Sequence, residues 1–459
     1  MTAPESAASA AARPLKDNVI RTIALALPVM AARLGLILLV TVDSVMTGRY
    51  SAEALAHYGI STAPHIFLLV VGIGLLVGTI VLVGQADGAG RPEACGGIWR
   101  RSLLIAAVLG SVWAVVLMFG ESILLLLGQS ESMAAGGGAA LTSFAVGMPA
   151  LLMYVSTSFF LEGVGRARAG MLIALGANFV NGGLNWLLIG GNLGFPEMGA
   201  AGAALATSIT RWVMLAALIG YVLSMADRAR YGVGVADNLG FQTTMRLLRL
   251  GAPFSVATGL EAGAFATIAT FAGRMGEVEM AAFQACMNVV SFAFMLAIGL
   301  STATSVRVAN AVGRNDRAGL AMSGWLGLAL VLAMMFLAGL VVISLREPIA
   351  AIYTEEESVR ALAQLGLFWV AAILMFDGAQ AVLMGAHRGA ADVMVPTGMQ
   401  GFSFWVVAVP LAYLLGLHLN LGVPGLFAAI FAATAVAAVL LSGRFAVLSR
   451  RPVAALYGN

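Results

Sequence analysis

Three acidic residues lie inside long apolar stretches of the sequence, where a carboxylate is costly to bury. Asp43 lies in LLVTVDSVMTG, Glu261 in GLEAGA and Asp377 in LMFDGAQ. A charged side chain at the centre of a bilayer costs about 2.5–3.5 kcal/mol on insertion scales. A carboxylate in such surroundings can bind a proton, or it can supply hard oxygen ligands to a cation. We therefore interpret the three acids as functional residues that respond to an ion.

A structural role is the alternative for each acid. Any of them could be a protonated or hydrogen-bonded core residue, or could lie close enough to a membrane interface to stay hydrated. The interface alternative has weight for Asp43, because Gly48 and Arg49 follow about one helical turn later.

Amide and basic side chains form a second polar group. In NFVNGGLNW, the spacing i, i+3, i+7 aligns Asn178, Asn181 and Asn185 on one helical face. Their alternative role is to join helices by amide hydrogen bonds, as is common in membrane bundles. The glycine-rich segment GAAGAALATS follows and contributes the hydroxyl of Thr207.

Two arginines also lie within apolar stretches. Arg33 is ten residues before Asp43, which places it about 80° around a helix and about 15 Å along it. Direct pairing with Asp43 is therefore not expected. We interpret Arg33 and Arg211, in TSITRW, as structural or gating residues that snorkel or pair with another element.

The elements that must position these residues are membrane helices. The 459 residues are 60% hydrophobic and 10% charged, and the mean hydropathy of +0.95 indicates an integral membrane protein. Runs of about 20 apolar residues without alternation predict helices. Twelve spans are predicted: 19–46, 58–84, 101–127, 139–162, 170–191, 199–224, 247–272, 281–306, 319–345, 359–385, 394–416 and 423–448.

The distribution of basic residues predicts the orientation. One alternate set of loops and ends is rich in Lys and Arg, and the opposite set is poor in them, so both termini are predicted to be cytoplasmic. The rich set is Lys16, Arg21, Arg91, Arg100, Arg101, Arg166, Arg168, Arg228, Arg230, Arg314, Arg317, Arg388, Arg450 and Arg451; the poor set is Arg49, Arg274, Arg346 and Arg360.

The sequence contains an internal repeat that spans most of the chain. A shift of 225 residues places Pro28 on Pro253 and Gly48-Arg49 on Gly273-Arg274. Each copy holds six spans, so the copies share one orientation and a pseudo-two-fold axis along the membrane normal. The predicted domains are a tail 1–18, an N-terminal lobe 19–225, a linker 226–245, a C-terminal lobe 246–448 and a tail 449–459. Such repeats favour transport, although channels and membrane enzymes also contain them.

The repeat separates shared features from unshared ones. The two prolines are shared and are expected to bend the first helix of each lobe. Asp43, Glu261 and Asp377 each lie opposite an apolar residue of the other copy. The Asn stripe is also unshared. A costly group present in only one copy requires its own explanation, which favours function.

Several segments together resemble the multidrug and toxic compound extrusion (MATE) family. They are ALPVM and VDSVMTG in the first span, GQADGAGR at 84–91, NWLLIGG with GAAGAALAT at 185–207, ANAVGRND at 309–316 and MGAHRGAADVMVPT at 384–397. The resemblance implies an all-α, twelve-helix exporter of varied, often cationic, amphipathic compounds, driven by inward Na+ or H+ flow. It also implies a bacterial inner-membrane location.

The resemblance also implies roles for individual residues. Asp43 resembles the first-helix acid of the N-terminal lobe, accompanied by Asn181, Asn185 and Thr207 at a cation or proton site. Glu261 and Asp377 resemble the paired acids of a C-terminal cation site in the sodium-coupled branch. Some family members have Asp where this chain has Asn185, and Arg33 stands where a neutral residue is usual. Asn178 and Arg33 are assigned to the substrate cleft or its gate.

The alternatives to drug antiport differ in substrate or in class. A flippase or exporter of a lipid-linked or metabolic substrate could share the repeat. An intramembrane enzyme is disfavoured, because the sequence has no Walker loop, GxSxG or HExxH and no clustered His or Cys. We expect no cofactor beyond the coupling ion, drug-like small molecules and the lipid bilayer as partners, no nucleic acid, and a monomer.

Overall fold

The regular elements of the protein are all helical within the part of the chain that the computed structural model describes, residues 14–234, 240–354 and 356–453. Twelve segments in these ranges are long and apolar enough to cross a membrane, as the sequence predicts. The predicted tails and linker lie partly outside the described residues, at 1–13, 235–239 and 454–459.

The helices of the first half are α1 (Leu15–Tyr50), α2 (Ala52–Leu76), α3 (Gly78–Gly88), α4 (Glu93–Met118), α5 (Gly120–Leu126), α6 (Glu131–Gly163), α7 (Arg168–Ile189), the 3-10 turn Asn192–Gly194 and α8 (Gly199–Ser224). The predicted third span, 101–127, extends too far. Here α4 ends at Met118 and a separate short helix, α5, follows.

The helices of the second half are α9 (Phe241–Met275), α10 (Glu277–Gly313), α11 (Arg317–Ser344), α12 (Arg346–Tyr353), α13 (Glu357–Gly389), α14 (Met394–Gly401), α15 (Val409–Ala412) and α16 (Gly422–Leu448). Two π-helical stretches, Phe402–Ala408 and Tyr413–His418, lie on either side of α15.

The repeat is visible in the bounds of these helices. The helices α1 and α9 end 225 residues apart, at Tyr50 and Met275. The helices α3 and α10 end the same distance apart, at Gly88 and Gly313. Pro28 and Pro253 lie inside α1 and α9, where the sequence places them.

Four helix ends in the described chain are followed by a left-handed residue. Gly90 (φ 71°) and Asn315 (φ 57°) are equivalent in the repeat, as are Gly165 (φ 75°) and Ala391 (φ 60°). After each, a backbone N–H donates to the carbonyl five residues earlier, which satisfies a carbonyl at the helix end. The bonds are Arg91 to Ala86 (3.0 Å), Asp316 to Ala311 (2.8 Å), Arg166 to Leu161 (2.7 Å) and Asp392 to His387 (2.9 Å).

The described chain divides into two compact units. The N-terminal unit is Ala31–Ser255, and the C-terminal unit holds the described residues up to Met30 and from Val256 onward. The start of α1 thus packs with the second-half helices. There Arg307 of α10 donates to the backbone oxygen of Asn18 at 2.7 Å and to its Oδ1 at 2.5 Å. The lobes 19–225 and 246–448, defined by chain order, stay a prediction.

Each unit contains a close helix crossing at an equivalent glycine. In the N-terminal unit a Cβ on Gly74 would lie 2.8 Å from the Cα of Ser255. In the C-terminal unit a Cβ on Gly299 would lie 2.9 Å from the backbone nitrogen of Met30. Glycine is required here because the two backbones approach too closely for a side chain.

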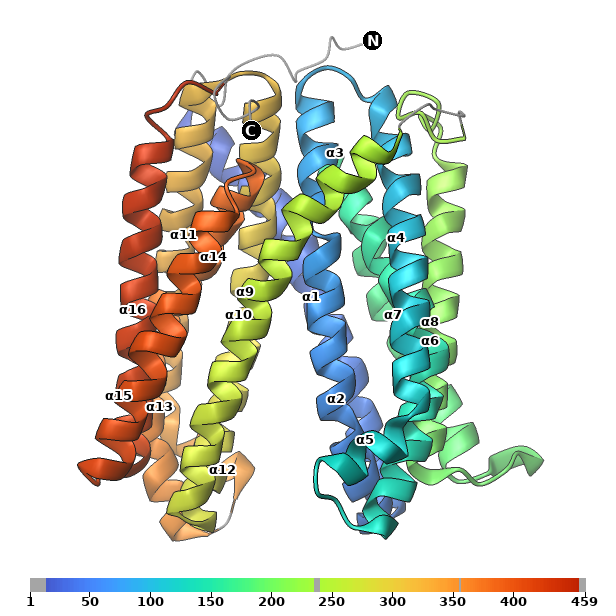
Figure 1. Ribbon diagram of the computed structural model, residues 1–459, viewed down its shortest axis with the longest axis vertical. Coiled ribbons are helices and arrows are strands. Elements are labelled where there is room, and N and C mark those ends of the chain that lie inside the picture. The colour runs from blue at the N-terminus through green and yellow to red at the C-terminus, as the bar shows by residue number, and fades with distance from the viewer. Residues whose placement is uncertain (1–13, 235–239, 355, 454–459) are drawn as a thin grey trace. The chain divides into compact units, whose positions relative to one another are not determined.

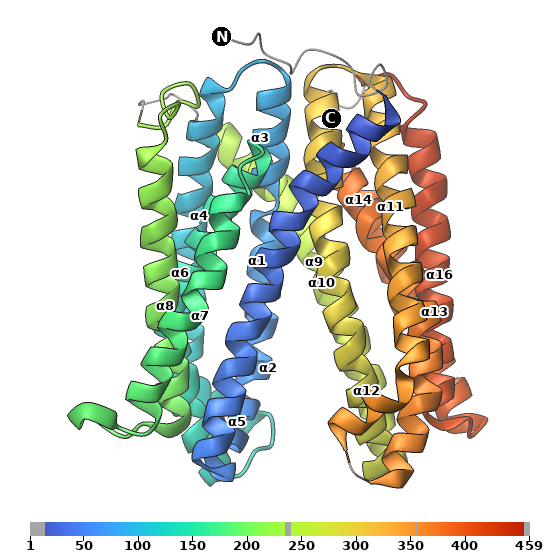
Figure 2. The ribbon, with the colours of Figure 1, turned by 180° about the vertical axis from the view of Figure 1, so that it is seen from behind.

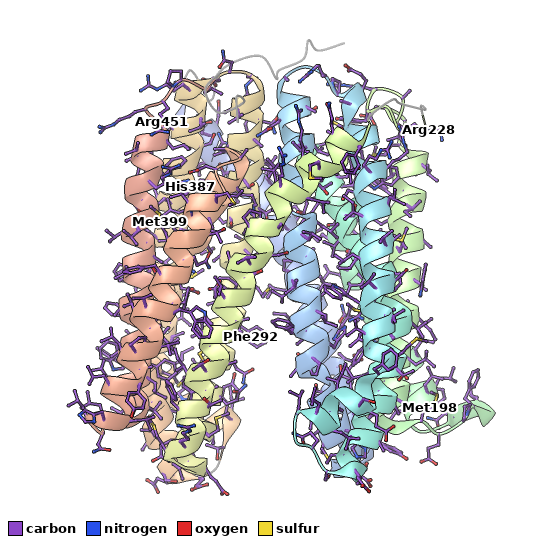
Figure 3. All side chains as sticks on the ribbon, viewed as in Figure 1. Met198, Arg228, Phe292, His387, Met399 and Arg451 are labelled. Carbon is purple, nitrogen blue, oxygen red and sulfur yellow. The ribbon has the colours of Figure 1, made fainter. Side chains whose placement is uncertain are left out.

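One helix is central to each unit, and the two are equivalent in the repeat. In the N-terminal unit α6 packs against α2, α4, α5 and α8; in the C-terminal unit α13 packs against α10, α11 and α16. Figures 1 and 2 show these helices running side by side within each unit. Arg228 and Met198, which flank α8, lie at opposite ends of the N-terminal unit (Figure 3).

We predict that Gly74→Ala destabilises the protein, whereas Gly273→Ala does not. The added methyl at residue 74 must displace the backbone of α9, at a cost of about 1–3 kcal/mol. A Cβ at Gly273 meets nothing within 4 Å. The midpoint of thermal unfolding in detergent measures both. Equal midpoints for the two variants would contradict the close crossing.

Candidate functional site

The carboxylate of Asp43 is fully buried in the N-terminal unit and accepts hydrogen bonds from three helices. The amide of Asn185, on α7, donates to Oδ1 at 2.7 Å. The hydroxyl of Tyr58, on α2, donates to Oδ2 at 3.0 Å, and that of Thr207, on α8, donates to the same oxygen. These bonds replace the water that a carboxylate would otherwise bind.

The donors of Asp43 are linked to one another through Asn181. Its amide nitrogen donates to the Thr207 hydroxyl at 3.1 Å, and its oxygen accepts from Asn185 at 3.2 Å. One turn of α7 separates the two asparagines, so they share a face as predicted. The structure thus brings Asp43, Asn181, Asn185 and Thr207 into one network; their role in ion coupling stays a prediction.

Asn178 lies on the same helix but joins a different contact. Its amide nitrogen donates to the backbone oxygen of Gly35 at 3.1 Å and to that of Ala174 at 2.9 Å. The bond to Gly35 joins α7 to α1, which is the structural role that the sequence left open, whereas the bond to Ala174 lies within α7. Its assignment to a substrate cleft or gate stays a prediction.

Arg33 pairs with a glutamate rather than with Asp43. Its Nη2 lies 3.6 Å from Oε1 of Glu162, near the end of α6. Ser158 donates to the same oxygen at 2.9 Å, and the guanidinium lies 5.7 Å from the ring centre of Phe159. This contact is consistent with the expectation that Arg33 does not pair with Asp43. The gating role of Arg33 stays a prediction.

The C-terminal unit places two glutamines around Glu261. Gln380, on α13, donates to Oε1 at 3.2 Å, and Gln400, on α14, donates to Oε2 at 2.7 Å. The buried amide oxygens of both glutamines have no hydrogen-bond partner among the residues that the structure describes. Asp377 is buried on the same face of α13, three residues before Gln380, whose amide donates to Glu261. The two predicted acids therefore belong to one polar group.

Three residues of these groups, Tyr58, Gln380 and Gln400, were not predicted from the sequence. The signal for Gln380 was present, because it follows Asp377 by three residues and so lies on the same helical face. Gln400 lies in a further membrane segment, and Tyr58 in the helix after Asp43. No spacing rule connects residues on different helices, so only the tertiary structure assigns them to these groups.

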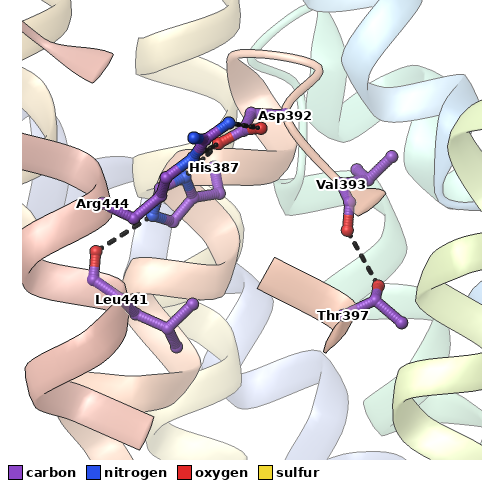
Figure 4. Close-up of polar contacts among 6 residues, drawn as sticks. All are labelled: His387, Asp392, Val393, Thr397, Leu441 and Arg444. Atoms are coloured by element: carbon purple, nitrogen blue, oxygen red, sulfur yellow. Dashed lines mark hydrogen bonds and ion pairs between the residues drawn. The ribbon is translucent and has the colours of Figure 1, made fainter. Parts of the chain in front are cut away.

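A third polar cluster ties the connection after α13 to α16 (Figure 4). Asp392 accepts from Nε of Arg444 at 3.0 Å and from Nη2 at 2.9 Å, and its Oδ2 lies 2.9 Å from Nδ1 of His387. The other ring nitrogen lies 3.1 Å from the backbone oxygen of Leu441. Burial acts to raise the pKa of Asp392, but the bonds and charges of His387 and Arg444 outweigh it and lower that pKa to about 2.

The family of the chain follows from comparison with known proteins. The MatE family model matches residues 28–187 and again residues 253–414, one match in each copy of the repeat. The chain therefore belongs to this family of membrane transporters, as its signature segments indicate, and it is an integral membrane transporter rather than an enzyme.

Curated relatives cover nearly the whole chain. A probable multidrug resistance protein NorM of Caulobacter vibrioides is 31% identical over 95% of this chain and 93% of its own length. A protein of the same name from Xanthomonas campestris is 32% identical over 98% of each.

Solved structures share the fold. The eukaryotic MATE transporter AtDTX14 has a TM-score of 0.87 at 19% identity, over 96% of this chain and 99% of that one. The MATE transporter VcmN of Vibrio cholerae in the bent form has a TM-score of 0.86 at 19% identity, over 95% and 98%.

We predict that the Asp392 cluster stabilises the protein at neutral pH and loses this effect in acid. The pKa of Asp392 is lower in the folded protein, about 2, than in an unfolded chain, so the effect is present above the unfolded value and disappears as pH falls through the folded value. Asp392→Asn should therefore cost about 2 kcal/mol above about pH 5, and the difference should shrink towards about pH 2.

The measurement is denaturant unfolding of the detergent-solubilised protein across this pH range. Asp17→Asn serves as the control, because Asp17 is exposed. A difference between the wild type and Asp392→Asn that does not change with pH would contradict the role of the charge.

Proposed function

We propose that this transporter is a secondary active multidrug exporter that antiports amphipathic, often cationic, organic compounds against H+ and Na+. The support is the pair of buried acidic groups, one in each compact unit, together with relatives named multidrug resistance proteins. A buried carboxylate binds an ion reversibly and changes the charge of its surroundings, which is what coupling to a gradient requires.

The Asp43 network favours a proton as its ligand. Three donors already occupy the two oxygens of this carboxylate, so a metal ion would have to displace them. A proton needs only one lone pair, and a carboxylate has about four such sites. Proton binding can therefore occur without dismantling the contacts of α1 with α2, α7 and α8.

The Glu261 group favours a hard cation such as Na+. It combines two carboxylates with the buried, unpartnered amide oxygens of Gln380 and Gln400. Carboxylate and carbonyl oxygens are the ligands that hard cations prefer. The amide nitrogens that now donate to Glu261 stabilise its carboxylate by hydrogen bonds, and a 180° rotation of each amide would present oxygen instead.

Ion binding and drug binding oppose each other in the proposed cycle. Because linkage is reciprocal, an ion that weakens drug binding is itself bound more weakly when the drug is present. The two halves of the repeat would move in a rocker-switch cycle, so that the bound substrate is exposed alternately to each side of the membrane. The distribution of basic residues supports cytoplasmic termini, and the bacterial relatives support the inner membrane.

A flippase or exporter of a lipid-linked or metabolic substrate is the second candidate, because the repeat and fold would serve it equally. Export that requires a particular lipid or metabolite, with no drug resistance on expression, would favour this candidate over drug antiport.

We predict that Glu261→Gln and Asp377→Asn each reduce Na+-driven drug efflux from proteoliposomes at least about tenfold, because a charged ligand of the cation is lost. Gln400→Leu should weaken the dependence on Na+ concentration without removing a charge. Glu277→Gln, at an exposed glutamate of the same unit, is the control and should leave efflux unchanged. Wild-type efflux in both acid variants would refute the Na+ site.

We predict that Asp43→Asn abolishes efflux driven by a pH gradient, whereas drug binding in the absence of a gradient persists. The amide of asparagine keeps the size of the side chain but cannot exchange a proton. Efflux under an imposed pH gradient, without Na+, measures this. A variant that folds normally and still exports at the wild-type rate would rule out Asp43 as the proton site.

A further inference from the structure

A buried arginine lies beside the Asp43 network. Arg211 follows Thr207 by four residues on α8, so both side chains lie on one face of that helix. Only 7% of Arg211 is exposed. Of the two predicted alternatives, snorkelling and pairing with another element, its contact with His65 of α2 agrees with the second.

The contacts of Arg211 are aromatic. Its Nη1 lies 3.1 Å from Nε2 of His65, and its guanidinium carbon lies 5.6 Å from the ring centre of Phe144. His65 stacks on the same phenylalanine, with ring centres 4.2 Å apart. Because a guanidinium can only donate, Nε2 of His65 accepts, and the imidazole is neutral while this bond holds.

No carboxylate of the described residues lies within ion-pair distance of the Arg211 guanidinium. Arg211 lies one turn after Thr207, whose hydroxyl donates to Asp43, so this geometry makes Asp43 the acid of the neighbouring network. A buried charge without a counter-charge is strongly destabilising. The titratable or charged groups that face Asp43 from the packed helices are Tyr58 and His65 of α2 and Arg211 of α8, while α7 contributes only neutral amides.

We propose that Arg211 is the fixed counter-cation of Asp43, so that proton binding changes this buried network from neutral to positive and repels a cationic substrate from the N-terminal unit. A lone buried acid would instead change from negative to neutral, and would release a cation only by losing an attraction. The inference rests on the proposed proton coupling and assigns Arg211 as a positioning residue that sets the charge of the site.

The proposed change of the network from neutral to positive predicts for which substrates the binding affinity depends on pH. Repulsion acts on the charge of the substrate and not on its shape. We therefore choose a matched pair of probes, the cation tetraphenylphosphonium and the neutral triphenylphosphine oxide. In the wild type, acid should lower the affinity for the cation about tenfold, as expected for like charges at low dielectric, and leave the affinity for the neutral probe unchanged.

The test measures equilibrium binding of both probes to the purified full-length protein at alkaline and acid pH. In Arg211→Met the loss of affinity for the cation in acid should disappear, whereas Arg211→Lys, which retains the charge, should behave as the wild type. His65→Gln retains a hydrogen-bond acceptor and should also keep the pH response. Arg274→Met, at an exposed arginine, controls for the loss of a positive charge in general.

The outcomes separate this inference from the proposed function. If Asp43→Asn removes the pH response but Arg211→Met retains it, the proton site stands and the role of Arg211 is wrong. If Asp43→Asn retains the pH response, the proton site itself is wrong. If Arg211→Met does not fold, the comparison of Arg211→Lys with Arg211→Gln decides, because only the lysine keeps the charge. Equal responses of the two would overturn the inference.

Discussion

The hydrocarbon core of a membrane offers no water to a polar side chain, so each buried polar group must find its partner inside the protein. This constraint explains the contacts of the acids in this transporter. Asp43 is surrounded by donors from three helices. Glu261 is held by two amides. In each group the partners of the buried acid come from more than one helix.

The two copies of the repeat share features of the backbone and differ in their polar side chains. Positions shared by the two copies act through the backbone: Gly74 and Gly299 allow close crossings, and residues such as Gly90 and Asn315 end helices in the left-handed region. Positions that differ carry the polar chemistry. A duplicated scaffold can therefore acquire two unlike polar groups, because changing a side chain inside a unit leaves its crossings and helix ends intact.

The two groups differ in how their oxygen atoms are used. The carboxylate oxygens of Asp43 accept from three side chains, two of them hydroxyls, whereas those of Glu261 accept from two amides. Among the described residues both groups also hold buried amide oxygens without a partner, that of Asn185 in the first and those of Gln380 and Gln400 in the second. In the proposed cycle the first group takes up a proton and the second a hard cation. In the proposal Arg211 adds a fixed positive charge to the first group alone. The group around Asp43 would therefore become positive when it binds its ion, whereas the group around Glu261 and Asp377 would only become less negative.

The sequence by itself determined the elements of this protein. Hydropathy located the twelve spans, because a helix must carry about 20 apolar residues to cross a bilayer. Self-comparison revealed the repeat, and the cost of buried charge identified Asp43, Glu261 and Asp377. The spacing of Asn181 and Asn185 placed them on one face, because helical geometry is local.

Only the tertiary structure decided the partners. The pairing of Arg33 with Glu162 and the approach of Tyr58 to Asp43 join residues on different helices. So do the convergence of Gln380 and Gln400 on Glu261 and the contact of Arg211 with His65. These contacts depend on the rotation and depth of each helix against its neighbours. Those quantities are set by the packing of many side chains at once, and no local pattern in the sequence encodes them.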